Sequence, residues 1–271
     1  MLTLSMMQTM WPSGNTRVAG LVEGIAAAAP TVFSKYGLTS DFLIAHAMAQ
    51  FSHECGAGKD LVENITGYTA RRASEVWPGR FSSADDCLVK VGSHVGDPDF
   101  AIKLIDQVYG GRNGNRAGTH DGSSFIGRGL AQVTGRSNYE RLGDKLGLKL
   151  LDNPGLINNP AHALECGVAM FVLCGCLPFA VADNVEMVTR KLNGGTVGLE
   201  DRIARVAQWK NAFLQAALNK LGAVPVLVTD GVFGKKSIDA LMTFQRRQGL
   251  ELSGRADAKT MAAIDIGIAS A

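Results

Sequence analysis

The stretch DFLIAHAMAQFSHECGAG, residues 41–58, decides how this sequence folds. Apolar side chains recur at helical spacing between Phe42 and Ala49 and predict a helix over residues 41–53. Thr, Ser and Asp at positions 39–41 are each suited to cap its first turn. Glycines at positions 56 and 58 then end the helix, because glycine readily adopts conformations that a helix excludes.

Much of the rest of the sequence before residue 223 also shows helical spacing of apolar residues. Further helices are predicted over residues 18–29, 68–76, 99–108, 138–146, 161–174, 185–192 and 199–221. An alternating strand pattern does not occur before residue 223, so the fold class is mainly all-α. Residues 110–128 are polar and rich in glycine, and loops of this length in compact domains are commonly functional.

Composition narrows the class of protein. The hydrophobic fraction of 46% supports a real core, and 27 basic against 25 acidic residues are too balanced for a nucleic-acid-binding protein. The apolar run over residues 18–32 contains Glu23 and Pro30, so we expect no stable membrane insertion. Residues 1–10 lack the basic start of a signal peptide. We therefore expect a monomer that stays in the cytoplasm until another agent releases it.

Metal and redox chemistry are not expected. Five cysteines cannot all pair, and no CxxC spacing suggests structural zinc, so they are interpreted as small buried side chains in a reducing cytosol. His53-Glu54 is reminiscent of a zinc protease motif, but Ala57 stands where the second histidine would be required. We predict neither a metal site nor an organic cofactor.

Glu54 and Glu63 form a candidate catalytic pair. Glycoside hydrolysis usually needs one protonated carboxyl group and one carboxylate. If the nine residues from Glu54 to Glu63 continued one straight helix, the two Cα atoms would lie about 14 Å apart and the side chains on opposite faces. The break at Gly56 and Gly58 allows the chain to turn back and bring Glu63 near Glu54. Glu54 at the helix end, near apolar Phe51, suits a general acid. By pattern alone, a solvated surface carboxylate remains open.

Several separated motifs follow one another in order. They are Ser52-His53-Glu54, Leu61-Val62-Glu63-Asn64, Tyr68, Trp77-Pro78-Gly79-Arg80-Phe81, Val108-Tyr109-Gly110-Gly111-Arg112, the segment from Gly127 to Tyr139, Leu192-Asn193-Gly194-Gly195 and Asp201-Arg202. Over roughly residues 40–210 this resembles the family-19 glycoside hydrolases, the plant-type chitinases, and in particular their compact bacterial and phage endolysin branch.

The resemblance implies roles for individual residues. It makes Glu54 the general acid and Glu63 the general base of an inverting mechanism, with Thr134 helping to hold the attacking water. It also implies substrate-binding positions, which are Gln132, Asn138, Tyr68, Asn193 and Arg202, the last as a basic residue that supports the acid–base centre. Turn chemistry alone accounts for part of the pattern, such as the Asn193-Gly194 dipeptide.

The sequence also departs from the family pattern. Ala131 stands where plant chitinases usually carry isoleucine, and the plant loops between the two glutamates are missing. A shortened cleft makes extended crystalline chitin a less natural substrate. Glu75 is a rival base, although its helical context before Trp77 is typical of a surface group.

The end of the chain resembles the type-1 peptidoglycan-binding domain. The motifs that carry the resemblance are Leu214-Gln215, Leu218, Leu221-Gly222, Asp230-Gly231, Phe233-Gly234, Ala240, Phe244-Gln245 and Gly249-Leu250. A weaker second half has Ser253-Gly254 and Asp257 where the family usually shows Asp-Gly and Gly. About 60 residues is enough for a small three-helix module.

Together these observations predict a lysozyme-like catalytic domain over residues 1–210 and a wall-binding domain over 211–271. The expected activity is hydrolysis of β-1,4 bonds between N-acetylmuramic acid and N-acetylglucosamine in peptidoglycan, as a phage endolysin that passes from the host cytoplasm to the periplasm and cell wall. Alternatives remain open at this point: a chitinase acting on N-acetylglucosamine oligomers, a lytic transglycosylase, or a non-catalytic wall-binding protein.

Overall fold

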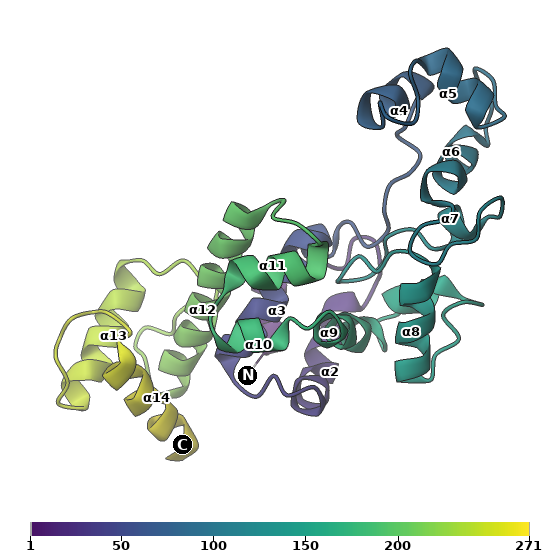
Figure 1. The fold of residues 1–271 in the computed structure, drawn as a ribbon. Helices are drawn as coiled ribbons and strands as arrows, with labels where there is room; N and C mark the ends of the chain where they lie inside the picture. Colours follow the sequence, from purple (N-terminus) through teal and green to yellow (C-terminus); the bar gives the residue numbers. More distant parts are fainter. Residues whose placement is uncertain (1, 271) are drawn as a thin grey trace.

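The computed structural model describes residues 2–270 and is built almost entirely of helices (Figure 1). The body contains α1 (Leu4–Met10), α2 (Leu21–Lys35), α3 (Asp41–Glu54), η1 (Gly56–Gly58), α7 (Asp121–Ser124), α8 (Arg136–Leu146), η2 (Pro154–Asn158), α9 (Ala163–Leu173), α10 (Leu177–Val181), α11 (Val185–Asn193) and α12 (Leu199–Lys220). The projecting arm contains α4 (Ala70–Val76), α5 (Ala84–Lys90) and α6 (Phe100–Tyr109), and the C-terminal part adds α13 (Lys235–Arg247) and α14 (Ala258–Ser270). The mainly-α expectation is confirmed.

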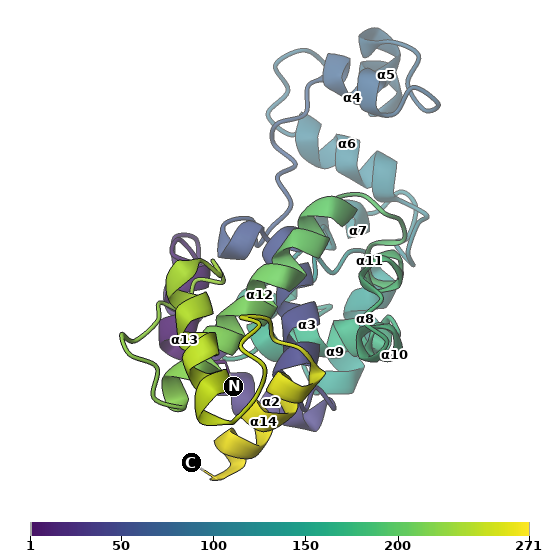
Figure 2. The same cartoon turned by 90° about the vertical axis from the view of Figure 1, so that its left-hand side faces the viewer.

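Helix α3 is the central element of the body. Every residue from Leu43 to Ser52 is buried, and the helix lies against α12 along its length (Figure 2). The Ser40 hydroxyl accepts a hydrogen bond from the Leu43 N–H at 3.3 Å and caps the first turn, one of the three residues expected there. Because α3 is surrounded on all sides, its direction sets where its last residue, Glu54, emerges.

A single hydroxyl joins three parts of the body. The indole N–H groups of Trp11 and Trp209 donate to Ser52 Oγ at 2.9 and 3.0 Å, and Ser52 Oγ donates to the Met48 carbonyl at 2.7 Å. All of these groups are buried. Ser52 thereby ties the end of α1 and the middle of α12 to the last turn of α3.

The prediction for the second helix was wrong at both ends. A helix over residues 18–29 was expected, whereas α2 runs from Leu21 to Lys35 with Pro30 inside it. Val32 and Phe33 are buried beyond the proline, so their packing against the core outweighs the lost backbone hydrogen bond. Four short α-helices were not predicted at all, namely α1, α5, α7 and α10, because none is long enough to show a periodicity.

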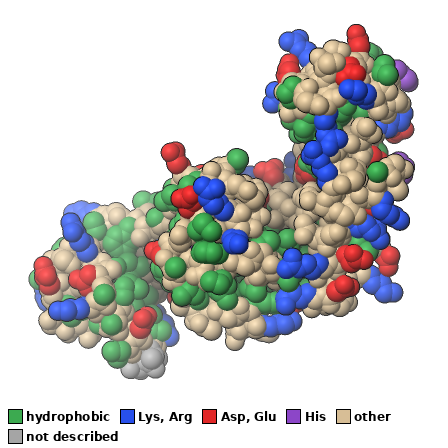
Figure 3. All heavy atoms as spheres, in the orientation of Figure 1, with side chains coloured by type: hydrophobic (Ala, Val, Ile, Leu, Met, Phe, Trp, Pro, Cys, Tyr) green, Lys and Arg blue, Asp and Glu red, His purple; other side chains and the backbone are tan. Residues whose placement is uncertain are grey.

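The arm has a small core of its own. Its buried side chains are Ala73, Phe81, Cys87, Val91, Leu104 and Val108, with Tyr68, Trp77 and Tyr109 partly buried against them. In the space-filling view the arm rises from the body and leaves an open notch at their junction (Figure 3). The segment between η1 and α4, which contains Glu63, leads from the body into this arm.

The C-terminal part is organised around two buried glutamines. Gln215 accepts from the Gly231 N–H at 2.9 Å and donates to Ser237 Oγ at the start of α13. Gln245 accepts from the Gly254 N–H at 3.0 Å and donates to Thr260 Oγ1 at the start of α14. The weaker second motif of the sequence therefore repeats the first in structure, with Ser253-Gly254 in the place of Asp230-Gly231.

Helix α12 belongs to both the body and the C-terminal part. Its first half packs on α3, and its second half contributes Leu214 and Leu218 to a separate core with α13 and α14. The predicted boundary at residues 210 and 211 falls inside this continuous helix and stays a prediction. No helix between residues 2 and 270 combines the length and the apolar character that crossing a bilayer requires.

Helix α3 also carries a buried histidine. His46 is fully buried, and its Nε2 is 2.8 Å from Asp183 Oδ1, which in turn accepts from Lys210 Nζ at 2.7 Å. Because a carboxylate only accepts, Nε2 carries the proton, and Nδ1 has no hydrogen-bond partner among the described residues. Burial lowers the pKa of His46 below its ordinary value.

We expect Ser52→Ala to lower the free energy of unfolding by about 2–4 kcal/mol, because two buried indole N–H groups lose their acceptor. Urea unfolding measures this loss. Ser74→Ala is the control, since Ser74 Oγ makes a solvent-exposed hydrogen bond to the Arg71 carbonyl, and it should change stability by less than about 0.5 kcal/mol. Equal effects of the two substitutions would contradict the role of Ser52.

We expect the folded state to lose stability as the pH falls below 6.5, the ordinary pKa of histidine. Below that pH the unfolded chain protonates His46 while the folded chain resists it, so the slope approaches about 1.4 kcal/mol per pH unit. His46→Gln keeps a donor toward Asp183 but does not titrate. Unfolding free energies measured between about pH 5 and 7 should therefore be flatter for this variant, and parallel curves would refute the assignment.

Candidate active site

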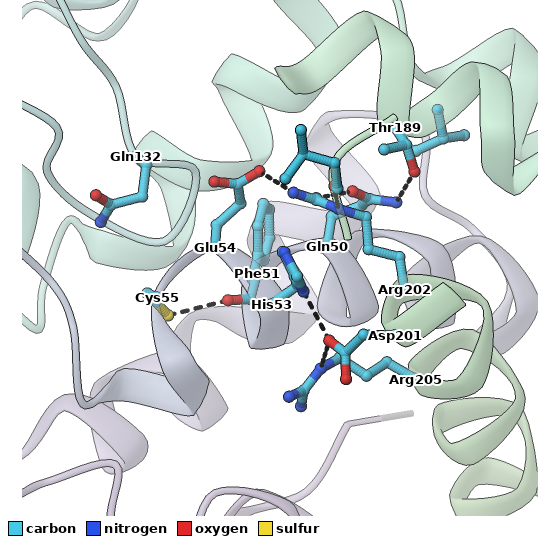
Figure 4. Close-up of polar contacts among 12 residues, drawn as sticks. Gln50, Phe51, His53, Glu54, Cys55, Gln132, Thr189, Asp201, Arg202 and Arg205 are labelled. Atoms are coloured by element: carbon cyan, nitrogen blue, oxygen red, sulfur yellow. Dashed lines mark hydrogen bonds and ion pairs between the residues drawn. The ribbon is translucent and has the colours of Figure 1, made fainter. Parts of the chain in front are cut away.

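Glu54 emerges from the C-terminal end of α3 and meets Arg202 of α12 (Figure 4). Arg202 Nη2 donates to Glu54 Oε1 at 2.6 Å. The Arg202 side chain is 2% exposed, whereas that of Glu54 is 14% exposed. The carboxyl group is therefore held from behind by a buried cation while one side of it remains open to an incoming ligand.

The chain reverses direction directly after Glu54. Gly56, Ala57 and Gly58 all have positive φ values, which no continuing helix allows. At Gly58 a Cβ would lie 2.8 Å from the Gly14 Cα, so only glycine fits against the neighbouring backbone. The reversal is closed by the Asp60 N–H, which donates to the Cys55 carbonyl at 2.9 Å. The expected break at these glycines is confirmed, and it directs the following segment towards the loop at residues 127–134.

Glu63 is held by two donors. Tyr109 Oη donates to Glu63 Oε1 at 2.6 Å, and the Gly127 N–H donates to Glu63 Oε2 at 3.1 Å. The Glu63 backbone N–H also donates to the Gly127 carbonyl at 2.8 Å. Burial, followed by the hydrogen bond to Glu63, raises the pKa of Tyr109, so its hydroxyl remains a donor. An acceptor-only carboxylate satisfies both donors.

The loop from Gly127 to Thr134 brings polar atoms to Glu63. A Cβ at Gly127 would lie 2.8 Å from Gln132 Oε1, 3.3 Å from Thr134 Oγ1 and 3.5 Å from Glu63 Cβ, so these three side chains surround one glycine. Gln132 has a φ of +46°, and its Nε2 donates to the carbonyls of Asp60 and Gly129. Its Oε1 is therefore the atom left to face the site. Thr134 Oγ1 donates to the Gln132 carbonyl at 2.9 Å.

The other predicted residues lie around this centre. Asn138 is half-buried, and its Nδ2 donates to the Thr134 carbonyl at 2.8 Å, so it braces the loop. Tyr68 packs on Trp77 in the arm, with ring centroids 5.0 Å apart. Asn193 is exposed at the end of α11, and no contact links it to the two carboxylates within residues 2–270.

A second ion-pair cluster lies beside Glu54. His53 Nδ1 is 2.6 Å from Asp201 Oδ2, which also accepts from Arg205 Nε at 2.6 Å. A Cβ at Gly198 would lie 2.4 Å from His53 Nε2, so the ring packs closely on the start of α12. Within the described residues, no group of three or more histidine, cysteine or acidic side chains is arranged to hold a metal ion. The cysteines are free thiols, and burial raises the pKa of Cys55 to about 12.

Sequence reasoning missed two residues of this site. Tyr109 lies in a quoted motif but received no role, because its contact with Glu63 spans 46 residues. Gln50 received none either, although its position four residues before Glu54 places both on one face of α3. Arg202 Nη1 donates to Gln50 Oε1 beneath Glu54 (Figure 4). The spacing of Gln50 and Glu54 is evident in the sequence, but their shared contact with Arg202 of α12 is not.

Residues 212–264 match the family model described as "Putative peptidoglycan binding domain". A glycosyl hydrolase family 19 domain-containing protein of Haemophilus influenzae is 28% identical over 184 residues, which cover 67% of this chain and 85% of that protein. An acidic 27 kDa endochitinase of Solanum lycopersicum is 46% identical over 46 residues, which cover 17% of this chain and 19% of the endochitinase.

Chitinase C from Streptomyces griseus is a solved structure that this chain resembles at 20% identity. The match has a TM-score of 0.48 and covers 77% of this chain and 90% of that one. The family-19 expectation from the sequence therefore rests on the sequence relatives, and the expectation for the C-terminal part on the family model. The chain is a glycoside hydrolase whose larger part is similar to family-19 glycosyl hydrolases and whose residues 212–264 match a peptidoglycan-binding domain.

Proposed function

We propose that this protein hydrolyses the β-1,4 bonds between N-acetylmuramic acid and N-acetylglucosamine in peptidoglycan, with inversion at the anomeric carbon. The observation that carries the proposal is the pair of differently held carboxyl groups, Glu54 against buried Arg202 and Glu63 against Tyr109 and Gly127. The peptidoglycan-binding domain supports the choice of polymer.

Glu54 acts as the general acid in this mechanism. Its carboxyl group lies at the end of α3, where Oε1 is occupied by Arg202 and Oε2 is left for the glycosidic oxygen. As the carboxyl group gives up its proton in the transition state, Arg202 stabilises the carboxylate that forms.

Glu63 acts as the general base and activates water. The Thr134 hydroxyl donates its hydrogen bond to the Gln132 carbonyl. Toward the attacking water, Thr134 Oγ1 therefore acts as an acceptor. A water that donates one proton to Glu63 and the other to Thr134 has its lone pair directed away from both. Gln132 Oε1 is then free to accept from a hydroxyl or amide group of the sugar. Asn138 maintains this arrangement by bracing Thr134.

Chitin hydrolysis is the second candidate. It is favoured by the resemblance to an acidic endochitinase of Solanum lycopersicum, which is confined to 46 residues. The same acid–base pair would serve a polymer of N-acetylglucosamine alone. In the preferred proposal the protein is a bacteriophage endolysin that acts as a monomer. Its action on the cell wall is supported by the wall-binding domain, since a hydrolase joined to such a domain is concentrated at that polymer.

We expect Glu54→Gln and Glu63→Gln each to lower kcat on purified peptidoglycan by about 10³-fold, because each removes a proton transfer from the transition state. Mass spectrometry should find reducing-end N-acetylmuramic acid in the wild-type digest, and NMR of the first products should show the α-anomer. Glu75→Gln is the matched control, since Glu75 pairs only with Arg71 and Arg72 on the arm and should keep full activity.

Other outcomes separate the alternatives. Anhydro-sugar ends with an active Glu63→Gln variant indicate a lytic transglycosylase, and reducing-end N-acetylglucosamine moves the cut to the other bond. Unchanged activity of Glu54→Gln refutes the mechanism. Absence of any wild-type product leaves a wall-binding protein.

We expect the full-length Glu54→Gln variant to sediment with insoluble peptidoglycan and to remain in solution with chitin, because residues 212–264 supply a peptidoglycan-binding domain. The inactive variant keeps the polymer intact during the measurement. Sedimentation with chitin alone would favour the second candidate instead.

A further inference from the structure

We infer that Gln50 is a positioning residue for Glu54, acting through Arg202 and tuning the pH range in which the enzyme works. The inference rests on the proposed role of Glu54 as the acid. Gln50 is fully buried on α3, one helical turn before Glu54, and its Oε1 accepts from Arg202 Nη1. It does not approach the substrate itself.

The orientation of the Gln50 amide is determined by its other partner. Thr189 Oγ1 on α11 donates its only proton to the Val185 carbonyl at 2.8 Å. It therefore accepts from Gln50 Nε2, at 3.3 Å, and this turns the amide oxygen toward Arg202. A directed chain of hydrogen bonds thus runs from α11 through α3 to the guanidinium group and ends at Glu54 (Figure 4).

The neutrality of Gln50 is the important chemical feature. Arg202 also donates a hydrogen bond from Nε to the Val197 carbonyl at 3.4 Å. Glu54 is therefore the one carboxylate paired with this buried cation within the described residues. Gln50 satisfies a second N–H of Arg202 without supplying negative charge, so the full charge of the guanidinium group acts on Glu54.

Other charged groups are carried by the elements around Glu54. They are His53 on α3, Asp201 and Arg205 on α12, and Asp60 and Glu63 on the segment after α3. His53, Asp201 and Arg205 bond to one another rather than to Arg202. A charge introduced at position 50 would therefore act on Glu54 mainly through Arg202, to which both side chains are hydrogen-bonded.

The test compares substitutions at position 50 in the full-length enzyme. Gln50→Glu keeps the acceptor but adds a second carboxylate to Arg202, which favours protonated Glu54. The alkaline limb of the kcat profile on peptidoglycan should move up by about one pH unit. Gln50→Leu removes the acceptor and should lower kcat by about 10–100-fold, because the carboxyl group loses its fixed geometry. Thr189→Val should cause a smaller loss in the same direction.

Gln107→Glu provides the control, because Gln107 is exposed on the arm and the same change of charge there should leave the profile unmoved. Gln50→Glu is nearly isosteric, so it tests the inference even if Gln50→Leu fails to fold, which thermal melting followed by circular dichroism would show. An alkaline limb that stays at the wild-type pH in folded Gln50→Glu overturns the inference.

A readout without turnover separates this inference from the proposed function. The guanidinium N–H resonances of Arg202, observed by ¹⁵N NMR, should shift in Gln50→Glu and lose their protection from exchange in Gln50→Leu. If these signals respond while Glu54→Gln remains fully active, the coupling to Arg202 holds and the acid assignment fails. If they do not respond, the positioning role is refuted even though Glu54→Gln is inactive.

Discussion

The packing of α3 against α12 is the constraint on which the rest of the structure depends. A serine hydroxyl in that contact, Ser52, receives two buried indole N–H groups, from Trp11 and Trp209, so the N-terminal segment and α12 are both fixed relative to α3. Buried donors are costly to leave unpaired, and this favours one register of the two helices over others. The same register brings Arg202 to Glu54, two residues beyond Ser52. The geometry of the site is thus set within the core.

The two carboxyl groups differ because two kinds of structure hold them. Glu54 is attached to a rigid, fully surrounded helix and meets a buried cation. Glu63 lies on a segment fastened by backbone hydrogen bonds to the loop at Gly127 and by a phenol at the base of the arm. Tyr109 therefore connects the packing of the arm with the position of the second carboxylate. Such differences in surroundings are what allow similar side chains to take opposite roles in proton transfer.

The sequence predicted the long helices well because their periodicity is local. The end of α3 and the turn after it followed from the residues themselves, as did α11 and α12 to within one residue. The helix predicted to end at residue 29 continues to Lys35 because the packing of buried residues beyond Pro30 is a tertiary effect. The resemblance singled out Gln132 and Thr134, which the structure gathers with Glu63 around Gly127. Tyr109 was missed because its partner lies far away in the chain.

Helix α12 carries Arg202 near its start and Leu214 and Leu218 in the core of the C-terminal domain. Twelve residues of unbroken helix between Arg202 and Leu214 span about 18 Å. In the proposed function, the wall-binding domain and the candidate catalytic residues are therefore joined by a rigid helix rather than by a flexible linker. A hydrolase that works as proposed would cut bonds at a fixed distance from each point of attachment, and the length of α12 would set the spacing of cuts along a glycan strand.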